Sequence, residues 1–258
     1  MTSKQRRIEE IKSSVRIKGS AAIKDLAEKL DVTTMTIRRD LEGIPEAEGF
    51  LLVRGVLFHT GNQKPVSGNQ YSLITAKTER AEQKSRIARA ALGLLQPGDS
   101  IIIDAGSTME YFVNSIPASM KLSVFCFSLN ILMCLLQKDN SRIMLTGGLY
   151  HSSSMMFESR EAIKLLRNSR SNKAFISASG INLKLGVTCS DDFESELKRT
   201  AIQSAQQRIL LVDSTKFGKV QRGFFAEVQD FERIITDDGA PADTIAALRD
   251  LGVTVDVV

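Results

Sequence analysis

The sequence has few of the side chains that bind metals or form disulfide bonds. Its 258 residues include three cysteines and two histidines: Cys126, Cys134, Cys189, His59 and His151. The cysteines are odd in number, stand in apolar or small-residue settings and lack the spacing of zinc ligands. We therefore expect no metal site, no cofactor, and thiols that stay reduced.

Segments that would direct the chain to a membrane are also lacking. The residues after Met1 are polar and lead directly into a helical pattern, so the apolar core of a signal peptide is missing. No later apolar run is long enough to cross a bilayer. These features predict a cytoplasmic protein.

A strong excess of charge is missing too. The formal net charge is +4, and the first 60 residues contain eleven Lys or Arg against nine Asp or Glu. Gross charge therefore does not identify a nucleic-acid-binding protein. With 43% hydrophobic and 25% charged residues, the composition is that of a globular chain with room for one small and one medium domain.

Two short amphipathic helices joined by a tight turn are predicted near the N-terminus. The first covers residues 21–30 and carries its apolar side chains on one face: Ile23, Leu26, Ala27 and Leu30. The second follows Thr33, whose hydroxyl can cap a helix start, and extends to Leu41. This spacing is typical of a helix-turn-helix, in which the second helix contacts DNA.

The second helix has an apolar side and a side rich in hydrogen-bond donors. With about 100° between successive residues, Thr34, Ile37 and Leu41 fall on the inner side. The candidate DNA-binding residues are the cap and the exposed or flanking positions: Thr33, Thr34, Met35, Thr36, Arg38 and Arg39. Arginine can bond to guanine or phosphate, and threonine can contact a phosphate or a thymine methyl. A solvated face that carries two arginines is the alternative.

Flanking segments can complete a small domain around these helices. Residues 5–15 place apolar side chains at helical spacing, so a third helix can share their core. Residues 49–58 are rich in β-formers around a glycine and predict the hairpin of a winged helix-turn-helix. Arg54 in this hairpin is a further candidate DNA contact. We predict a DNA-binding domain over residues 1–58 and a turn-rich linker over residues 59–80.

From residue 81 onward, short apolar runs alternate with helical segments. The runs cover residues 101–104, 124–127, 142–146, 174–177, 209–213, 234–237 and 253–258. Because Ile, Leu and Val follow one another without polar alternation, these strands should be buried on both faces. The predicted fold class is therefore α/β, with a mainly parallel sheet over residues 81–258 behind the N-terminal winged helix-turn-helix.

Polar side chains and glycines gather where these strands end, the edge at which parallel sheets bind ligands. Residues 104–108 form a small-residue turn before a helix, where backbone amides can hold a phosphate; a plain capped turn is the alternative. Five polar loops follow the strands, at residues 104–108, 128–130, 146–148, 177–180 and 213–219. Together they suit a polyhydroxyl ligand that bears a phosphate. They supply these candidate effector-binding residues: Asp104, Gly106, Ser107, Thr108, Ser128, Asn130, Gly147, Gly148, Ser179, Gly180, Asp213 and Lys216.

The order of these motifs resembles the DeoR family of bacterial transcriptional repressors. Residues that match 36–41 belong to the DNA-recognition helix of that family. Its sensor-domain motifs Asp-x-Gly-Ser-Thr, Gly-Gly, Glu-x-x-x-Lys and Asp-x-x-Lys-Phe-Gly stand here at residues 104–108, 147–148, 194–198 and 213–218. The resemblance implies a sensor fold related to ribose-5-phosphate isomerases. It also adds Glu194 and Lys198 to the effector site, although a surface salt bridge would have the same spacing.

Two positions depart from the family pattern. Thr33 stands where the family usually has serine, which should cap a helix equally well. Val56 stands where many members have a second glycine, which affects the backbone of the predicted hairpin. Residues 126–130, 147–151, 177–180 and 216–220 are most similar to members that control deoxyribonucleoside catabolism, and this similarity implies deoxyribose 5-phosphate as the effector.

A sugar-phosphate isomerase with an N-terminal helical domain is the alternative from a different class. Such chemistry needs a carboxylate base, for which Asp104, Asp192, Glu194 and Asp213 are candidates. An enzyme has no use for a capped recognition helix, so we predict a non-enzymatic repressor. Its expected partners are double-stranded operator DNA, a phosphorylated sugar and at least one further copy of the chain.

Overall fold

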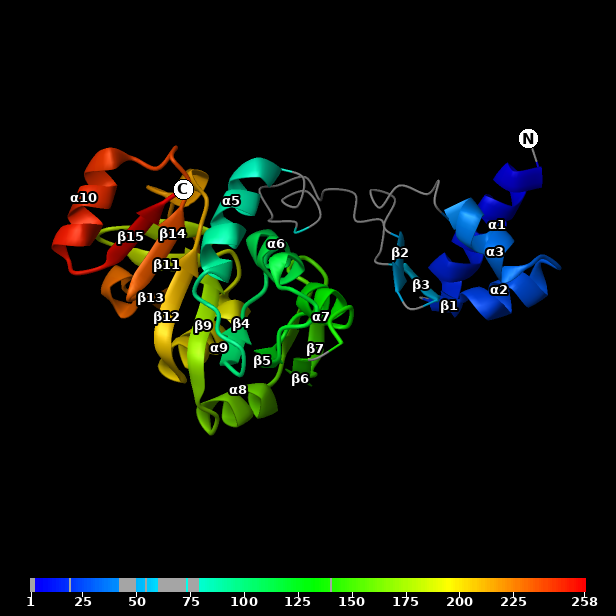
Figure 1. The fold of residues 1–258 in the computed structure, drawn as a ribbon, viewed down its shortest axis with the longest axis horizontal. Coiled ribbons are helices and arrows are strands. Elements are labelled where there is room, and N and C mark those ends of the chain that lie inside the picture. The colour runs from blue at the N-terminus through cyan, green and yellow to red at the C-terminus, as the bar shows by residue number, and fades with distance from the viewer. Residues whose placement is uncertain are drawn as a thin grey trace. The chain divides into compact units, whose positions relative to one another are not determined.

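The computed structural model describes residues 3–18, 20–41, 50–53, 55–59, 73, 79–139 and 141–258 (Figure 1). The chain divides into two units, Met1–Gly68 and Asn69–Val258. Within the described ranges, no helix is both long and apolar enough to cross a lipid bilayer. Most of the predicted linker, residues 59–80, lies outside the described residues.

Three helices and a three-stranded antiparallel sheet make up the N-terminal unit. The helices are α1 (Ser3–Lys18), α2 (Ile23–Lys29) and α3 (Thr34–Leu41), and the strands lie in the order β1 (Ser20–Ala22), β3 (Val56–His59) and β2 (Phe50–Val53). All three helices and the β2–β3 hairpin contribute to one core: Ile11, Val15, Ile23, Leu26, Ala27, Ile37, Leu41, Phe50 and Leu57. The predicted winged helix-turn-helix is therefore confirmed.

One helix boundary in this unit was predicted wrongly. Ala21 and Ala22, expected to begin the first helix of the motif, lie in β1 and pair with β3. The Ile23 N–H then donates a hydrogen bond to the Gly55 carbonyl at 2.6 Å. Pairing with the hairpin thus outweighs the helix propensity of alanine, because it satisfies backbone groups that would otherwise lack partners.

A seven-stranded parallel sheet forms the centre of the C-terminal unit. The strand order is β15 (Thr254–Val257), β14 (Arg233–Thr236), β12 (Ala205–Leu211), β9 (Ser171–Ser177), β4 (Ser100–Ile103), β5 (Leu122–Cys126) and β6 (Ser141–Leu145). Each neighbouring pair is parallel, and each strand matches one of the seven predicted runs. The predicted sheet is confirmed.

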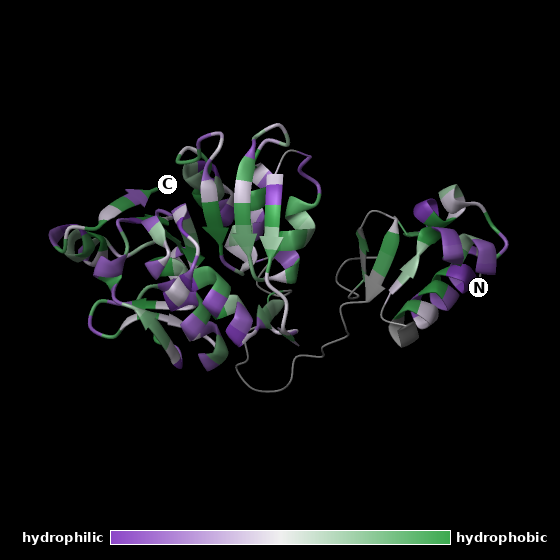
Figure 2. Ribbon diagram, turned by 90° about the horizontal axis from the view of Figure 1, so that it is seen from below, coloured by the Kyte–Doolittle hydropathy of each residue, from purple (hydrophilic) through white to green (hydrophobic). Residues whose placement is uncertain are grey.

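Helices cover both faces of this sheet. Ile101 and Ile103 of β4 pack into one core with α5 (Ala81–Leu92), α6 (Ser107–Ser115) and α7 (Leu129–Leu135). Ile102 packs into a second core with α8 (Arg160–Arg167), α9 (Asp192–Gln203) and α10 (Ala242–Asp250). Because alternate side chains of a strand point to opposite faces, a sheet covered on both sides needs continuous apolar strands. Figure 2 shows this hydrophobic colour along the strands.

Two small antiparallel sheets were not predicted. The first is the hairpin of β7 (Leu149–His151) and β8 (Met156–Glu158), and the second has the order β10 (Gly180–Asn182), β11 (Gly186–Cys189) and β13 (Gly223–Ala226). Such short strands do not show a recognisable period in the sequence. Two short 3₁₀ helices, η2 (Ser214–Lys216) and η3 (Val228–Asp230), also lie in this unit.

The order of the strands reverses at β4. From β4 the chain continues to β5 and β6 on one side, and later to β9, β12, β14 and β15 on the other. The connections after β4 and β9 therefore leave in opposite directions, which opens a crevice at the carboxyl ends of the strands. The candidate effector site lies at this edge.

Candidate DNA-recognition helix and effector pocket

Helix α3 begins with the predicted cap. The Thr36 N–H donates a hydrogen bond to Thr33 Oγ1 at 3.1 Å, and the two threonine hydroxyls lie 3.0 Å apart. Ile37 and Leu41 are buried on the inner side. The cap therefore sets the start of α3, and the two apolar side chains set which face points outward.

The outer face of α3 is wider than predicted. Met35 is 67% exposed, Arg38 and Arg39 are exposed, and Thr36 is half-buried. Thr34, predicted to point inward, is exposed as well. Because α3 begins at Thr34, the helix provides no earlier turn to cover that side chain. The exposed surface thus combines hydroxyls, two guanidinium groups and one apolar side chain.

Asp40 is a buried residue of α3 whose role the sequence did not predict. The Arg7 Nε of α1 donates a hydrogen bond to Asp40 Oδ2 at 2.8 Å, and the Asp40 side chain is 4% exposed. Asp40 lies three positions after Ile37 and thus on the same side of the helix. This ion pair joins α3 to α1 beneath the outer face. Arg54, the predicted contact in the hairpin, lies outside the described residues.

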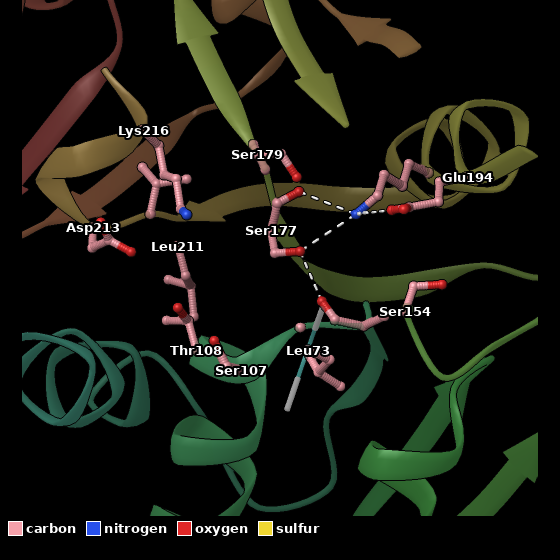
Figure 3. Close-up of a pocket in the computed structure, with 15 residues that line it drawn as sticks. Leu73, Ser107, Thr108, Ser154, Ser177, Ser179, Glu194, Leu211, Asp213 and Lys216 are labelled. Carbon is pink, nitrogen blue, oxygen red and sulfur yellow. Dashed lines mark hydrogen bonds and ion pairs between the residues drawn. The ribbon is translucent and has the colours of Figure 1, made fainter. Parts of the chain in front are cut away.

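A pocket opens at the carboxyl edge of the parallel sheet, where the strand order reverses (Figure 3). Its lining comes from the ends of β4, β9 and β12, from the start of α6, from α9 and η2, and from two positions elsewhere in the chain: Ala105, Gly106, Ser107, Thr108, Ser177, Ala178, Ser179, Leu211, Val212, Asp213, Lys216, Glu194, Lys198, Leu73 and Ser154. The space open to the centre of a water molecule is about 30 Å³. That is room for about two or three waters.

Lys198 lies at the centre of a buried group of charges. Its ammonium donates hydrogen bonds to Asp104 Oδ2 and, at 3.2 Å, to the Ser177 carbonyl, and it lies 3.6 Å from Glu194 Oε2. The three charged side chains are between 0% and 8% exposed. The alternative of a surface salt bridge between Glu194 and Lys198 is therefore wrong, because the helix face that carries them is buried against β9.

Two carboxylates share this single ammonium, and the arrangement shifts the pKa values of the group. Burial is the main cause that raises the pKa of Glu194 to about 7; the Asp104 and Asp191 carboxylates act in the same direction, and Lys198 opposes them. Burial alone would lower the pKa of Lys198, but the charges of Asp104 and Glu194 outweigh it and leave that pKa raised. Lys198 is therefore a fixed cation, and Glu194 can gain or lose a proton near neutral pH.

Asp104 lies behind the pocket and not in its wall. Its Oδ2 accepts hydrogen bonds from the Ser177 N–H at 2.8 Å and from Lys198, and the Ser177 hydroxyl lies 2.9 Å away. Its Oδ1 is buried without a hydrogen-bond partner among the described residues. Asp104 thus holds Ser177 and Lys198 in place, so that these two side chains form the wall.

The other end of the pocket is formed by the start of α6 and by η2. Gly106 precedes α6 with a φ of +123°, a value that favours glycine, and an added Cβ would lie 3.1 Å from Ser177 Oγ. Ser107 and Thr108 begin the helix and line the same end of the cavity as Lys216 (Figure 3). A helix start carries backbone N–H groups without helical partners, which suits an anion next to a lysine.

Besides Asp104, five predicted effector-site residues do not line this pocket. Gly148 and Gly180 instead allow close backbone packing, because an added Cβ would lie 2.1 Å from the Glu158 carbonyl oxygen or 2.5 Å from that of Lys219. The Asn130 side-chain amide donates to the Gly106 carbonyl at 3.4 Å and so supports the loop. The remaining two, Ser128 and Gly147, are also absent from the lining.

Several pocket residues carried no recognisable signal in the sequence. Leu73 belongs to the segment predicted as a linker, and Ser154 lies in the turn between β7 and β8. Lys84 of α5 is buried nearby, and its ammonium donates to the Glu79 carbonyl at 2.7 Å. Burial lowers the pKa of Lys84, whose charge interacts with Asp213 and Lys216. Ser177 could have been included, because it opens the polar loop after β9.

No group of three or more His, Cys, Asp or Glu side chains that could hold a metal ion occurs within the described residues. Cys126 and Cys189 are buried, and burial raises the pKa of their thiols to about 12 and about 11. Cys134 is half-buried. The buried thiols therefore stay protonated at neutral pH, as expected of structural cysteines.

Family comparisons match both units. The model of the DeoR-like helix-turn-helix domain matches residues 7–55, and that of the DeoR C terminal sensor domain matches residues 79–238. Between them these models cover the recognition helix and nearly all of the effector pocket.

Curated relatives extend the match over the length of the chain. The deoxyribose operon repressor of Escherichia coli (strain K12) is 30% identical over 92% of this chain and 91% of its own length. The lactose phosphotransferase system repressor of Lactococcus lactis subsp. lactis is 30% identical over 92% of both chains. The putative aga operon transcriptional repressor of Escherichia coli O157:H7 is 30% identical over 100% of this chain and 95% of its own.

Solved structures give a distant match to part of the chain. Ribose 5-phosphate isomerase A from Methanocaldococcus jannaschii aligns over 53% of this chain and 54% of its own, with 15% identity and a TM-score of 0.39. The fold assignment rests on the strand order and on the family match.

Proposed function

The chain belongs to the DeoR family of transcriptional repressors, and we propose that it represses a sugar or nucleoside catabolic operon until a phosphorylated sugar releases it from its operator. In this proposal residues 1–58 bind DNA, residues 59–80 connect the two parts, and residues 81–258 bind the effector. Its relatives bear the names of repressors and regulators, so the chain is a DNA-binding regulator and the isomerase alternative is rejected.

The outer face of α3 supports the DNA-binding part of the proposal. The exposed arginines can bond to base edges or phosphates, and the helix start with its two threonines suits a phosphate. The ion pair between the half-buried Arg7 and the buried Asp40 holds the helix from behind. Thr33, Thr34, Met35, Thr36, Arg38 and Arg39 are the proposed contacts, together with Arg54. An operator with two half-sites would be bound by a dimer or a larger assembly.

One observation carries the effector part of the proposal: the buried Asp104–Lys198–Glu194 group adjoins a helix start and a second lysine in one pocket. Lys198, Ser177, Ser179 and Glu194 offer donors and acceptors for sugar hydroxyls. Lys216 and the start of α6 offer a cation and backbone N–H groups for a phosphate. A polyhydroxyl molecule with a single phosphate matches both ends of the pocket.

Deoxyribose 5-phosphate is the first candidate for the effector. Residues 126–130, 147–151, 177–180 and 216–220 resemble family members that control deoxyribonucleoside catabolism. One relative is named a deoxyribose operon repressor. Other relatives are named for lactose and aga systems, so related sugar phosphates are the natural comparison set.

A ligand panel followed by operator binding tests this function. We expect one sugar phosphate to stabilise the purified protein by about 2.7 kcal/mol at a hundredfold its Kd, and to weaken operator binding in a fluorescence anisotropy titration. Inorganic phosphate and the unphosphorylated sugar are the controls. The effector assignment would be refuted if no sugar phosphate stabilised the protein and none changed its affinity for the operator.

A pair of lysine variants makes the test specific to the pocket. Lys216 lines the cavity, whereas Lys219 three residues later is exposed outside it. Lys216→Ala should weaken effector binding by about 1.5–3 kcal/mol, the contribution of a charge-assisted hydrogen bond. It should leave operator binding unchanged. Lys219→Ala should behave like the parent. Equal effector affinity in both variants would exclude Lys216 from the site.

A further inference from the structure

The turn between β7 and β8 brings a buried hydroxyl group to the wall of the pocket. Ser154 is 3% exposed and lines the cavity, and its hydroxyl has no hydrogen-bond partner within the part of the chain that the structure describes. Buried polar side chains nearly always have such a partner. The Ser154 hydroxyl therefore lacks a partner that a ligand in the pocket can supply.

The backbone around Ser154 is fixed by the end of β5. The Leu129 N–H donates a hydrogen bond to the Met155 carbonyl at 2.7 Å, and the Phe157 N–H donates to the Phe127 carbonyl at 2.9 Å. Met155 has a φ of 55°, which costs energy for a residue with this side chain and persists only where the surroundings impose it. The fold thus holds Ser154 in place, although the Ser154 hydroxyl contributes no hydrogen bond to that fold.

Further buried groups on the same edge of the sheet also lack partners among the described residues. They follow β4, β5 and β6 and are between 0% and 5% exposed: Asp104 Oδ1, Ser128 Oγ, Asn130 Oδ1 and Thr146 Oγ1. Carboxylate and amide oxygens can only accept hydrogen bonds, so they need a donor. A phosphate dianion has no proton to donate, whereas a sugar hydroxyl donates and accepts. This part of the site therefore suits the sugar and not the phosphate.

The charges of the pocket favour the same direction. Ser154 and Lys216 lie on opposite sides of the cavity, and Glu194 lies on the Ser154 side (Figure 3). The Lys198 ammonium near Glu194 is shared with Asp104, so carboxylates outnumber cations there. A phosphate would be repelled from this side and attracted to Lys216.

We propose that Ser154 is a specificity-determining residue, whose hydroxyl binds a hydroxyl of the sugar and orients the effector with its phosphate at Lys216 and the start of α6. A site built to bond a ligand hydroxyl rejects an analogue without it, because the buried protein group then stays unpaired. This inference rests on the proposed function and adds to it the direction in which the ligand lies.

Thermal stability without any ligand is the first test. Ser154→Ala should keep or raise the parental melting temperature, because the hydroxyl that it removes has no partner to lose. Ser204→Ala is the matched control: Ser204 is 2% exposed, and its hydroxyl donates to the Leu166 carbonyl at 2.9 Å. That variant should melt at a lower temperature. An equal loss in Ser154→Ala would show that the Ser154 hydroxyl serves the fold, and would overturn the inference.

Calorimetric titration is the second test. Ser154→Ala should bind deoxyribose 5-phosphate, or any other sugar phosphate that stabilises the parent, about 2- to 12-fold more weakly, the range of a neutral hydrogen bond. Ser153→Ala should bind as the parent does, because Ser153 belongs to the same turn and does not line the cavity. Inorganic phosphate should bind parent and Ser154→Ala alike, and should bind Lys216→Ala more weakly.

The outcomes separate this inference from the function on which it rests. Parental affinity of Ser154→Ala for the sugar phosphate would refute the role of Ser154, and weaker binding of inorganic phosphate to Ser154→Ala would refute the orientation. Both results leave the proposed function standing as long as the parent binds the sugar phosphate. A parent that binds no sugar phosphate would refute the proposed function and this inference with it.

Discussion

Lys198 of α9 donates a hydrogen bond to Asp104 after β4 across 94 positions of the sequence, and neither side chain reaches solvent. Glu194, one helical turn before Lys198, adds a second carboxylate at 3.6 Å. The effector pocket is therefore built on a buried group with more negative than positive charge. Its stability and its pH dependence follow from that imbalance.

Loss of Lys198 should destabilise the fold strongly. Lys198→Ala leaves two buried carboxylates without a counter-ion, and removal of one partner from a buried ion pair typically costs about 3–5 kcal/mol. Arg208→Ala is the matched control, because Arg208 and Glu232 form an ion pair with 33% and 42% exposed side chains, and exposed pairs contribute about 0–1 kcal/mol. Urea denaturation of both variants measures the difference. Similar losses of unfolding free energy in the two variants would show that the charge of Lys198 does not stabilise the buried Asp104–Lys198–Glu194 group.

The raised pKa of Glu194 predicts how stability changes with pH. The folded protein retains a proton on Glu194 up to about pH 7, whereas the unfolded chain releases it near the ordinary value of 4.5. Between these two values the folded state binds more protons, so the contribution of Glu194 to stability falls as pH rises and is fully lost above about pH 7. Glu194→Gln should remove this fall. Melting temperatures of parent and variant from pH 4 to pH 8 check it, and parallel curves would contradict the assignment.

Much of the fold could be predicted because the strands are buried on both faces. Runs such as Ile101–Ile103 need no polar alternation, so their composition alone indicates a parallel sheet, and a parallel sheet indicates ligands at its carboxyl edge. The spacing of Glu194 and Lys198 also predicted a shared helix face. It could not show that the face is buried, because burial depends on parts of the chain that pack against it only in the fold, such as β9 and the loop that carries Asp104.

The residues that escaped prediction are those whose position depends on the tertiary structure. Leu73 has no apolar period around it, and Ser154 belongs to a turn between strands of three residues each. Gly148 illustrates the converse: its Gly-Gly motif indicated a ligand loop, whereas the backbone of Glu158 explains it. A local sequence pattern identifies a turn. It does not show whether the turn packs against a ligand or against another part of the chain.

Adjacent glycines provide a direct test of that distinction. Gly148 has a φ of +150°, and an added Cβ would overlap the Glu158 carbonyl, whereas at Gly147 nothing lies within 4 Å. Gly148→Ala should therefore lower the free energy of unfolding by about 1–3 kcal/mol, the range for local backbone strain, or by more if the hairpin cannot shift. Gly147→Ala should be nearly neutral. Denaturant titrations would decide, and equal losses at both positions would contradict the role of Gly148 in packing β7 against β8.

The two arginines of α3 should contribute differently to DNA binding. If Arg39 contacts a base edge, Arg39→Ala should cost about 1–3 kcal/mol at the operator and reduce its preference over scrambled DNA. If Arg38 contacts a phosphate, Arg38→Ala should weaken both DNAs equally and lower the slope of log K against log salt by about one. Arg6→Ala is the control. Arg6 belongs to α1 and not to the recognition helix, and its side chain is 80% exposed.

Competition between operator and scrambled DNA, measured at several salt concentrations, separates these effects. Reversed behaviour of the two arginine variants would exchange their roles and leave α3 as the recognition helix, since both side chains are exposed on the same helix. Parental affinity and parental salt slope in both variants would remove α3 from the interface. In that case the Arg7–Asp40 ion pair and the Thr33 cap would serve only to stabilise the N-terminal unit, and the DNA contacts would have to be sought on another of its surfaces.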